Sequence, residues 1–486
     1  MDDSLLTDDD LRLRPGQGQR SPWLREALAD EDDPPPAPAL AGDTDADVAI
    51  IGGGYTGLWT AYHLLGRDPA LRVVVLEADI CGGGPSGRNG GFVNSWWDEA
   101  SAFVELFGSE AAAACLEESA RSVHAIGAWC DDHGVDAHFR RAGMLTISTA
   151  SAHDDRLIDD VAAARRLGDS EALLALDASE VAAVCRSPRF RGGSLMRDGA
   201  TVHPALLARG LRRVCLDRGA AIHEGTAVTG VRKGPGGWLR AMTSGGEVRA
   251  RHVVLAVNAW ASGWRESRGR VLAWGSFMVR SEPIPDLIDR ELGWTGGESI
   301  VDARFSVHYL HVTRDGRIAI GAGGGRPGFG GRIGASFSDD VASARRAAHA
   351  FRWLFPQLRE VRLTDAWGGP IDISPDHLPH VWSERGGRLH LVGGYSGNGV
   401  GPSHLVGRIL ASLALDADEP IARLAIVGRS RHRFPPEPMR YIGARIAREA
   451  MIRREDAEER GEKPHRLLRE ISRLPRRLGY HLGPGE

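Results

Sequence analysis

The sequence has few cysteines and no long apolar run. Its 486 residues include five cysteines, which are scattered and never spaced as CxxC. This pattern argues against a disulfide framework and a structural zinc site, so we expect reduced thiols, no metal and a cytoplasmic protein. No uninterrupted apolar stretch reaches the roughly 18 residues that a membrane span needs. Because the acidic start also lacks the features of an export signal, we expect neither export nor membrane insertion.

The sequence also lacks an excess of basic residues. Sixty lysines and arginines stand against 64 aspartates and glutamates, which gives a formal net charge of −4. A surface without a basic surplus is a poor binder of nucleic acid, so we expect a small-molecule partner instead. The chain also exceeds the about 250–300 residues that one core usually supports. We therefore expect two intimately joined domains.

A glycine-rich turn near the N-terminus is the clearest motif. A strand expected at 47–51 runs into Gly52-x-Gly54-x-x-Gly57, apolar residues at helical spacing follow, and a second expected strand ends in Glu77. The first glycine would form the turn, the second would let backbone N–H groups approach a pyrophosphate, and the third would let the helix pack closely on the strand. Glu77 would accept a ribose hydroxyl. The pattern predicts a dinucleotide site, and the alternative is a glycine-rich turn in an ordinary βαβ unit.

Two more glycine-rich stretches follow. Residues 79–97 read DICGGGPSGRNGGFVNSWW, in which Arg88 and Asn89 would meet a ligand unless the stretch is only a flexible loop. Residues 393–401 read GGYSGNGVG and lead into a helix expected to start at Pro402. The N-terminus of that helix would present partial positive charge to a ligand, and a plain helix start is the alternative.

The remaining pattern alternates between helical and extended segments. We expect helices at 100–134, 152–167, 203–218 and from 439 onward, and strands at 143–148, 193–196, 221–231, 238–243, 247–257 and 388–392, with a hairpin at 308–321. An acidic N-terminal arm carries Trp23 and Leu24, which we expect to dock on the body.

Five residues are candidates for lining a substrate pocket. The alternative for a tryptophan that adjoins another one is a core anchor. For the arginine, the histidine and the tyrosine, the alternative is a paired surface residue or a half-buried residue of a sheet. The candidates are Trp97, Arg304, His308, Tyr309 and Trp367.

Taken together, the motifs resemble the D-amino-acid oxidase and glycine oxidase superfamily of FAD-dependent oxidoreductases. The matching stretches are GGGYTG with Glu77, SGRNGG, VHPALLARGL, VVLAVNAW, WGGPIDISPDHLP and GGYSGNGVGPS. Within the superfamily the chain looks most like the γ-glutamylputrescine oxidoreductase group and the aminophosphonate oxidoreductase group.

The resemblance implies a mixed α/β fold. A Rossmann-like FAD-binding domain of the glutathione-reductase type would be interleaved with an antiparallel-sheet substrate domain. The expected FAD-binding segments are 47–98, 199–264 and 361–432, and the expected substrate segments are 99–198 and 265–360. An N-terminal arm (1–46) and a C-terminal helical tail (433–486) would complete the chain.

The resemblance also implies non-covalent FAD, because no histidine or cysteine matches the covalent attachment sites of some relatives. The glycines of the first turn would take the pyrophosphate, Glu77 the adenosine ribose, Val228 the adenine region, and the C-terminal glycine loop the pyrimidine edge of the flavin. The full implied set is Gly52, Gly54, Tyr55, Thr56, Gly57, Glu77, Arg88, Asn89, Gly90, Gly91, Val228, Ala256, Gly397, Gly399, Val400 and Gly401.

Departures from the superfamily pattern narrow the expected substrate. Glycine oxidases carry two arginines where this chain has Ile371 and Gly397, which argues against an α-amino acid held by its carboxylate. The only lysines are Lys233 and Lys463, so the oxygen-activating lysine of sarcosine oxidases has no counterpart.

We therefore expect oxidation of a primary or secondary amine, similar to γ-glutamylputrescine or to an aminophosphonate. A neutral amine would transfer hydride to flavin N5, and the resulting imine would hydrolyse to an aldehyde. The alternatives are an NAD-dependent dehydrogenase and a non-catalytic FAD-binding subunit. The sequence does not indicate how many subunits assemble.

Overall fold

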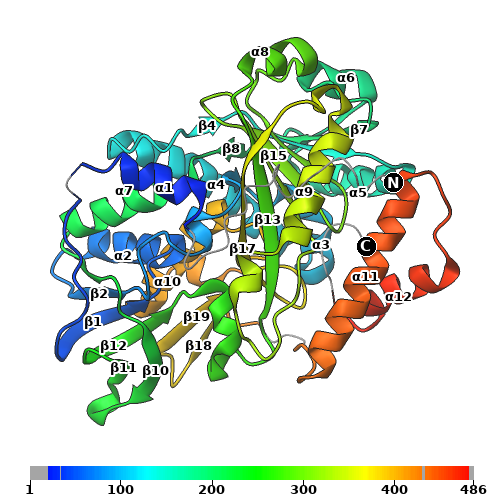
Figure 1. Cartoon of the computed structure of the whole chain (residues 1–486). Helices are drawn as coiled ribbons and strands as arrows, with labels where there is room; N and C mark the ends of the chain where they lie inside the picture. Colours follow the sequence, from blue (N-terminus) through cyan, green and yellow to red (C-terminus); the bar gives the residue numbers. More distant parts are fainter. Residues whose placement is uncertain (1–19, 33, 430–432, 481–486) are drawn as a thin grey trace.

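Two eight-stranded sheets form the body of the molecule. A computed structural model of the chain describes residues 20–32, 34–429 and 433–480, so residues 1–19 of the expected arm lie outside the described residues. One sheet and its helices lie on the left in Figure 1, the second sheet runs through the centre, and two C-terminal helices lie at the right. This arrangement confirms the expected α/β class with a parallel and a largely antiparallel sheet. The segment boundaries given above stay a prediction.

The first sheet has a parallel centre and antiparallel flanks. Its parallel strands, in spatial order, are β9 (Ala221–His223), β2 (Val73–Leu76), β1 (Thr44–Ile51), β12 (Glu247–Leu255) and β19 (Leu389–Gly393). The antiparallel strands are β10 (Val228–Lys233) and β11 (Leu239–Thr243), which extend from β12, and β18 (His380–Glu384), which pairs with β19. The strand expected at 221–231 is therefore wrong: it is two strands, β9 and β10, separated by a left-handed Gly225 (φ 64°) and lying at opposite ends of the order β10-β11-β12-β1-β2-β9.

Helices cover one face of this sheet: α2 (Tyr55–Arg67), α7 (Pro204–Asp217) and α10 (Val400–Ala414) (Figure 1). A Cβ at Gly57 would collide with the carbonyl oxygen of Gly52, so only glycine lets α2 approach β1 this closely. A Cβ at Gly407 would likewise press on Trp59, which is fully buried. Small residues thus bring α2 and α10 together, with the N-termini of both helices near the ends of the parallel strands.

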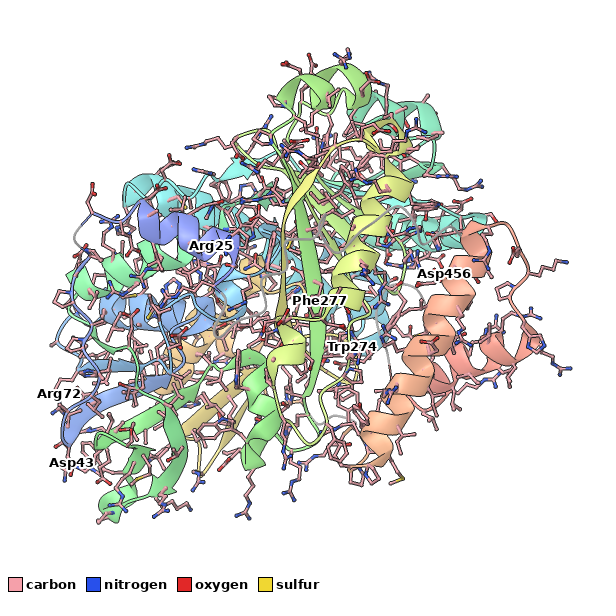
Figure 2. All side chains as sticks on the ribbon, in the orientation of Figure 1. Arg25, Asp43, Arg72, Trp274, Phe277 and Asp456 are labelled. Carbon is pink, nitrogen blue, oxygen red and sulfur yellow. The ribbon has the colours of Figure 1, made fainter. Side chains whose placement is uncertain are left out.

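The second sheet is built around a long antiparallel pair. Its strands, in spatial order, are β17 (Leu363–Ile373), β13 (Leu272–Ser281), β16 (Ile318–Ala322), β15 (His308–Val312), β14 (Ser299–Asp302), β5 (Met144–Ser148), β7 (Gly192–Met196) and β6 (Leu173–Leu176). Only β14 and β5 pair in parallel. Helix α9 (Val341–Leu354) covers the face that carries Val279 and Leu310. Figure 2 labels Trp274 and Phe277 on β13 in the middle of the molecule.

Smaller elements connect the two sheets. A three-stranded sheet contains β3 (Phe92–Asn94), β8 (Gly199–Thr201) and β4 (Arg140–Arg141), and the helices are α3 (Ala100–Phe107), α4 (Ser109–Asp132), α5 (Ser151–Arg166), α6 (Ala178–Val184) and α8 (Pro285–Leu287). The helical pattern expected at 100–134 is confirmed, and Gly108 (φ 75°) divides it into two helices. No helix within the described ranges is long and apolar enough to cross a membrane.

The N-terminal arm docks as expected. Helix α1 (Pro22–Ala29) begins at Ser21, whose side chain accepts a hydrogen bond from the N–H of Leu24 at 3.1 Å. Trp23 and Leu24 are both buried, and Trp23 Nε1 donates to the carbonyl of Asn89 at 3.2 Å. The arm thus contacts the second glycine-rich stretch directly.

The C-terminal tail consists of α11 (Met439–Glu459) and α12 (Arg466–Arg477), which pack on each other. Arg304, which is buried, faces three carboxylates of α11: it lies 3.5 Å from Glu455, 3.0 Å from Asp456 and 2.8 Å from Glu459. Figure 2 labels Asp456 on α11. Burial raises the pKa of Glu459 to about 7. One arginine therefore anchors the tail to the second sheet.

Replacing this arginine tests the anchor. In Arg304→Met, Glu455 and Glu459 would remain buried without a cation, which typically costs about 3–5 kcal/mol. We expect a lower melting temperature and faster trypsin cleavage between α11 and α12. Arg453→Met is the control, because Arg453 lies on α11, close to these carboxylates in sequence, but has a side chain that is 64% exposed. Equal proteolysis of the two variants would contradict the anchoring role.

Candidate active site

A cavity of about 690 Å³ lies where the three glycine-rich stretches meet. We call it the first cavity. Its walls include Gly54 from the first stretch, Asn89 from the second and Gly399 from the third, which are separated by up to 345 residues in sequence (399 − 54). The expected residues that line it are Gly52, Gly54, Tyr55, Thr56, Glu77, Arg88, Asn89, Val228, Ala256, Gly397, Gly399 and Val400.

The turn after β1 is held open by glycines. Gly52 has φ 111°, and a Cβ there would strike the carbonyl oxygen of Ala256 on the neighbouring strand. Gly54 caps α2, and a Cβ there would lie 2.8 Å from Ser86 Oγ, which accepts the N–H of Tyr55 at 2.9 Å. The start of α2 thus borders the cavity without a side chain in front of it. This environment suits a phosphate group.

Glu77 stands at the end of β2 beside this turn. Its carboxylate accepts the N–H of Gly53 at 2.7 Å and the N–H of Asp79 at 2.9 Å. Burial raises its pKa, although both N–H groups oppose the shift. The carboxylate is therefore held in place at the cavity wall, where it can accept hydroxyl donors.

Asp372, at the end of β17, fixes the third glycine-rich stretch. Its side chain is completely buried and accepts the N–H of Gly394 at 2.6 Å, the N–H of Tyr395 at 3.2 Å and Nδ2 of Asn258 at 3.0 Å. Burial raises the pKa of Asp372 to about 6. One carboxyl group thus ties the second sheet to the start of the loop before α10 and to the segment after β12.

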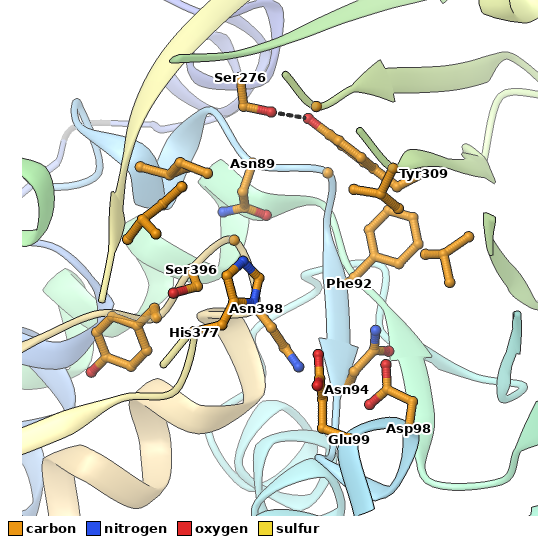
Figure 3. A pocket seen from close by; sticks show the side chains of 18 of the residues that line it. Asn89, Phe92, Asn94, Asp98, Glu99, Ser276, Tyr309, His377, Ser396 and Asn398 are labelled. Atoms are coloured by element: carbon orange, nitrogen blue, oxygen red, sulfur yellow. Dashed lines mark hydrogen bonds between the residues drawn. The ribbon is translucent and has the colours of Figure 1, made fainter. Parts of the chain in front are cut away.

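A second cavity, of about 230 Å³, adjoins the first. Eight residues line both cavities: Pro85, Arg88, Asn89, Pro370, Ile371, Tyr395, Gly397 and Val400. Side-chain alternation directs Ser276 of β13 and Tyr309 of β15 into the second cavity, opposite the face that α9 covers. Their hydroxyl oxygens are 2.8 Å apart (Figure 3), and burial raises the pKa of Tyr309 to about 12.

Apolar walls and one polar end characterise the second cavity. Phe92, Trp96, Trp274 and Ile373 contribute to the apolar walls. Figure 3 shows Asn94, Asp98, Glu99 and Asn398 gathered on the side of the pocket away from Ser276 and Tyr309. Burial lowers the pKa of His377, which also lines the cavity, to about 4, so this imidazole is neutral.

Of the five pocket candidates, the structure places Tyr309 in the second cavity and the other four elsewhere. Arg304 is held by α11, and His308 Nδ1 lies 2.6 Å from Asp302. Trp97 is buried in the core, and Trp367 Nε1 donates to the carbonyl of Arg88 at 2.9 Å. Trp367 therefore holds the backbone of the second glycine-rich stretch without lining either cavity.

Three of the implied cofactor residues act through backbone packing instead of lining the first cavity. Gly57 packs α2 on β1, and a Cβ at Gly91 or Gly401 would strike the carbonyl oxygen of Val202 or Asn94, respectively. Gly90 lines the second cavity.

Several residues that line the second cavity were not predicted from the sequence. They are Asn94, Asp98, Glu99, Arg156, Asp160, His377 and Asn398. The run NSWWDE, which begins inside the second glycine-rich stretch, was a usable signal for the first three, because a loop that reaches a ligand delivers the next residues close to it. Arg156 and Asp160 lie on α5 with ordinary helical spacing, and no sequence signal marks them.

The first cavity fits an extended dinucleotide cofactor. The N-terminus of α2 beside Gly54, the fixed carboxylate of Glu77 and the start of α10 all line this one cavity, and they suit a pyrophosphate, a ribose and a ring system, respectively. The adjoining second cavity leaves room for a substrate at the α10 end.

Comparisons with known proteins agree with this geometry. The family model DAO, described as FAD dependent oxidoreductase, matches residues 47–413. "Probable oxidoreductase OrdL" of Rhizobium meliloti (strain 1021) is 30% identical over 393 residues, covering 78% of this chain and 86% of that protein. "Gamma-glutamylputrescine oxidoreductase" of Escherichia coli (strain K12) is 28% identical over 375 residues, covering 76% of this chain and 83% of that protein. Glycine oxidase from Geobacillus kaustophilus shares the fold, with a TM-score of 0.64 at 22% identity over 80% of this chain and 100% of that one.

Gly54→Val tests the assignment of the first cavity. The new side chain would press on Ser86 and fill the space in front of α2, so we expect the purified variant to contain little flavin by visible absorbance. Gly230→Val is the control, because a Cβ at Gly230 on β10 would meet nothing within 4 Å. Full flavin content in Gly54→Val would refute the placement.

Asp372→Ala tests the junction between the sheets. Three N–H donors would lose their acceptor, at about 1–3 kcal/mol for each one left unsatisfied. We expect a lower melting temperature and weaker flavin retention than in Asp286→Ala, which removes an exposed carboxylate. Identical melting curves for the two variants would contradict this role.

Proposed function

Because the chain belongs to the DAO family of FAD-dependent oxidoreductases, we propose that it oxidises the C–N bond of a primary or secondary amine to an imine, which hydrolyses to an aldehyde. The observation that carries the proposal is the boundary between the two cavities. There Ile371 and Gly397 face each other, with 3.9 Å between Ile371 Cδ1 and a Cβ built on Gly397. These are the positions at which the sequence departs from glycine oxidases, and neither side chain can hold a carboxylate.

Residues of the first cavity would hold FAD along its length. The start of α2 would bind the pyrophosphate, Glu77 the ribose, and Asn89 with the start of α10 the flavin end. When bound, FAD supplies the acceptor for a hydride from the substrate carbon. The N-terminus of α10 contributes partial positive charge at that end of the cavity.

Residues of the second cavity would bind and orient the amine. The apolar walls exclude water and disfavour a charged nitrogen at the reacting end, so the amine reacts in its neutral form. Neutral His377 and the Ser276–Tyr309 pair offer hydrogen-bonding groups without a fixed charge. Both lysines are exposed, Lys233 at the end of β10 and Lys463 between α11 and α12, and neither lines either cavity.

A panel of amines tests the proposal. We expect the purified protein to be yellow and its flavin to bleach when it is mixed anaerobically with primary or secondary amines, more readily than with glycine. Repeating the reaction in air with a peroxide assay identifies oxygen as acceptor or excludes it. Colourless protein would refute FAD binding, which also separates this function from an NAD-dependent dehydrogenase. A yellow protein that no amine bleaches would favour the non-catalytic subunit.

A further inference from the structure

The polar end of the second cavity carries an unusual set of charges. Asp98 and Glu99 come from the short helix Trp97–Glu99, and Asp160 and Arg156 come from α5; all four line the cavity. Three carboxyl groups therefore share one guanidinium group. Figure 3 shows the side chains of Asp98 and Glu99 at this end, beside Asn94 and Asn398.

Arg156 is matched chiefly with Asp160. Asp160 is the carboxylate that most favours the charged form of Arg156, and Asp160 also accepts the N–H of Ser101 at 3.2 Å. Arg156 further donates to the carbonyl of Ala303 at 3.0 Å. Asp98 and Glu99 lie next to each other and share with Asp160 the charge of this one arginine. Burial raises the pKa of both, and their proximity raises that of Glu99 further.

Unpartnered oxygen atoms also line the second cavity. Asn94 and Thr146 are only 6% and 5% exposed, and Asn94 Oδ1 and Thr146 Oγ1 have no hydrogen-bond partner. The same holds for Oδ1 of Asp98 and Oδ1 of Asn398. Buried acceptors are normally satisfied, so this group of oxygens calls for a ligand that donates several hydrogen bonds. An ammonium group donates three and accepts none.

We propose that this end of the second cavity binds a cationic nitrogen at the far end of the substrate. The substrate would then be an amine with a second, positively charged nitrogen, such as a diamine, and not an aminophosphonate. This inference rests on the proposed function, because it takes the reacting nitrogen to lie at the boundary with the first cavity. An anionic phosphonate would instead meet a surplus of carboxylates.

The test compares butane-1,4-diamine, n-butylamine and 2-aminoethylphosphonate with the flavin-loaded enzyme. The readout is the second-order rate constant of anaerobic flavin bleaching, with binding of the diamine measured separately by calorimetry. We expect the rate constant for the diamine to exceed that for n-butylamine by more than about tenfold, because losing the partner of a buried charge typically weakens binding by at least that factor. In the double variant Asp98→Asn/Glu99→Gln, the ratio of diamine to monoamine should fall by at least about tenfold.

A matched control keeps the test specific. Asp159→Asn removes an exposed carboxylate next to Asp160 on α5 and should keep the wild-type ratio. Flavin content and melting temperature show whether each variant is folded, and if the double variant is unfolded, the single variant Asp98→Asn replaces it. Equal rates for diamine and monoamine in the wild type, or a faster reaction with 2-aminoethylphosphonate, would overturn the inference.

The calorimetry separates failure of this inference from failure of the proposed function. If no amine bleaches the flavin but the diamine binds to the wild type and not to the variant, the proposed reaction is wrong and the cation site stands. If the diamine binds to neither, or equally to both, the cation site is wrong.

Discussion

The hydrogen bonds of Asp372 hold the two halves of the molecule in one arrangement. The carboxyl group lies at the end of β17, yet its donors belong to the loop before α10 and to the segment after β12. Burying a carboxyl group is costly, and the three N–H donors offset that cost only when all three segments are in place. The residue therefore couples the second sheet to the first at the point where the two cavities meet.

Close backbone packing supplies the rest of the architecture around that point. Gly57 lets α2 pack closely on β1, and Gly407 lets α10 pack closely against Trp59. Gly401 lies against the carbonyl of Asn94. In each case a methyl group would collide with backbone atoms or, at Gly407, with the Cβ of Trp59. These contacts bring two helix N-termini to one cavity, where their partial charges act on the same ligand.

The charged residues divide into structural and cavity-lining groups. Arg304 forms salt bridges with the carboxylates of α11 and so stabilises the tail. Arg156 and its three acidic neighbours instead line the second cavity. Removing charges from water is unfavourable in both places. At α11 the charges pair with one another, while in the cavity Asp98, Glu99 and Asp160 share the single cation Arg156.

The sequence by itself determined the family, the first glycine turn, Glu77 and the glycine-rich stretches. Such features are readable because they depend on local backbone conformation: a glycine with positive φ, or a strand that runs directly into a helix, leaves a short and specific pattern. Only the tertiary structure decided which charged side chains line the second cavity. Arg304 and Arg156 look alike in sequence, and their roles differ because α11, some 150 residues beyond Arg304, forms salt bridges with Arg304, whereas Arg156 lines the second cavity. The division of 221–231 into two strands has the same origin, since strand partners distant in sequence, and not the local pattern, set where each half pairs.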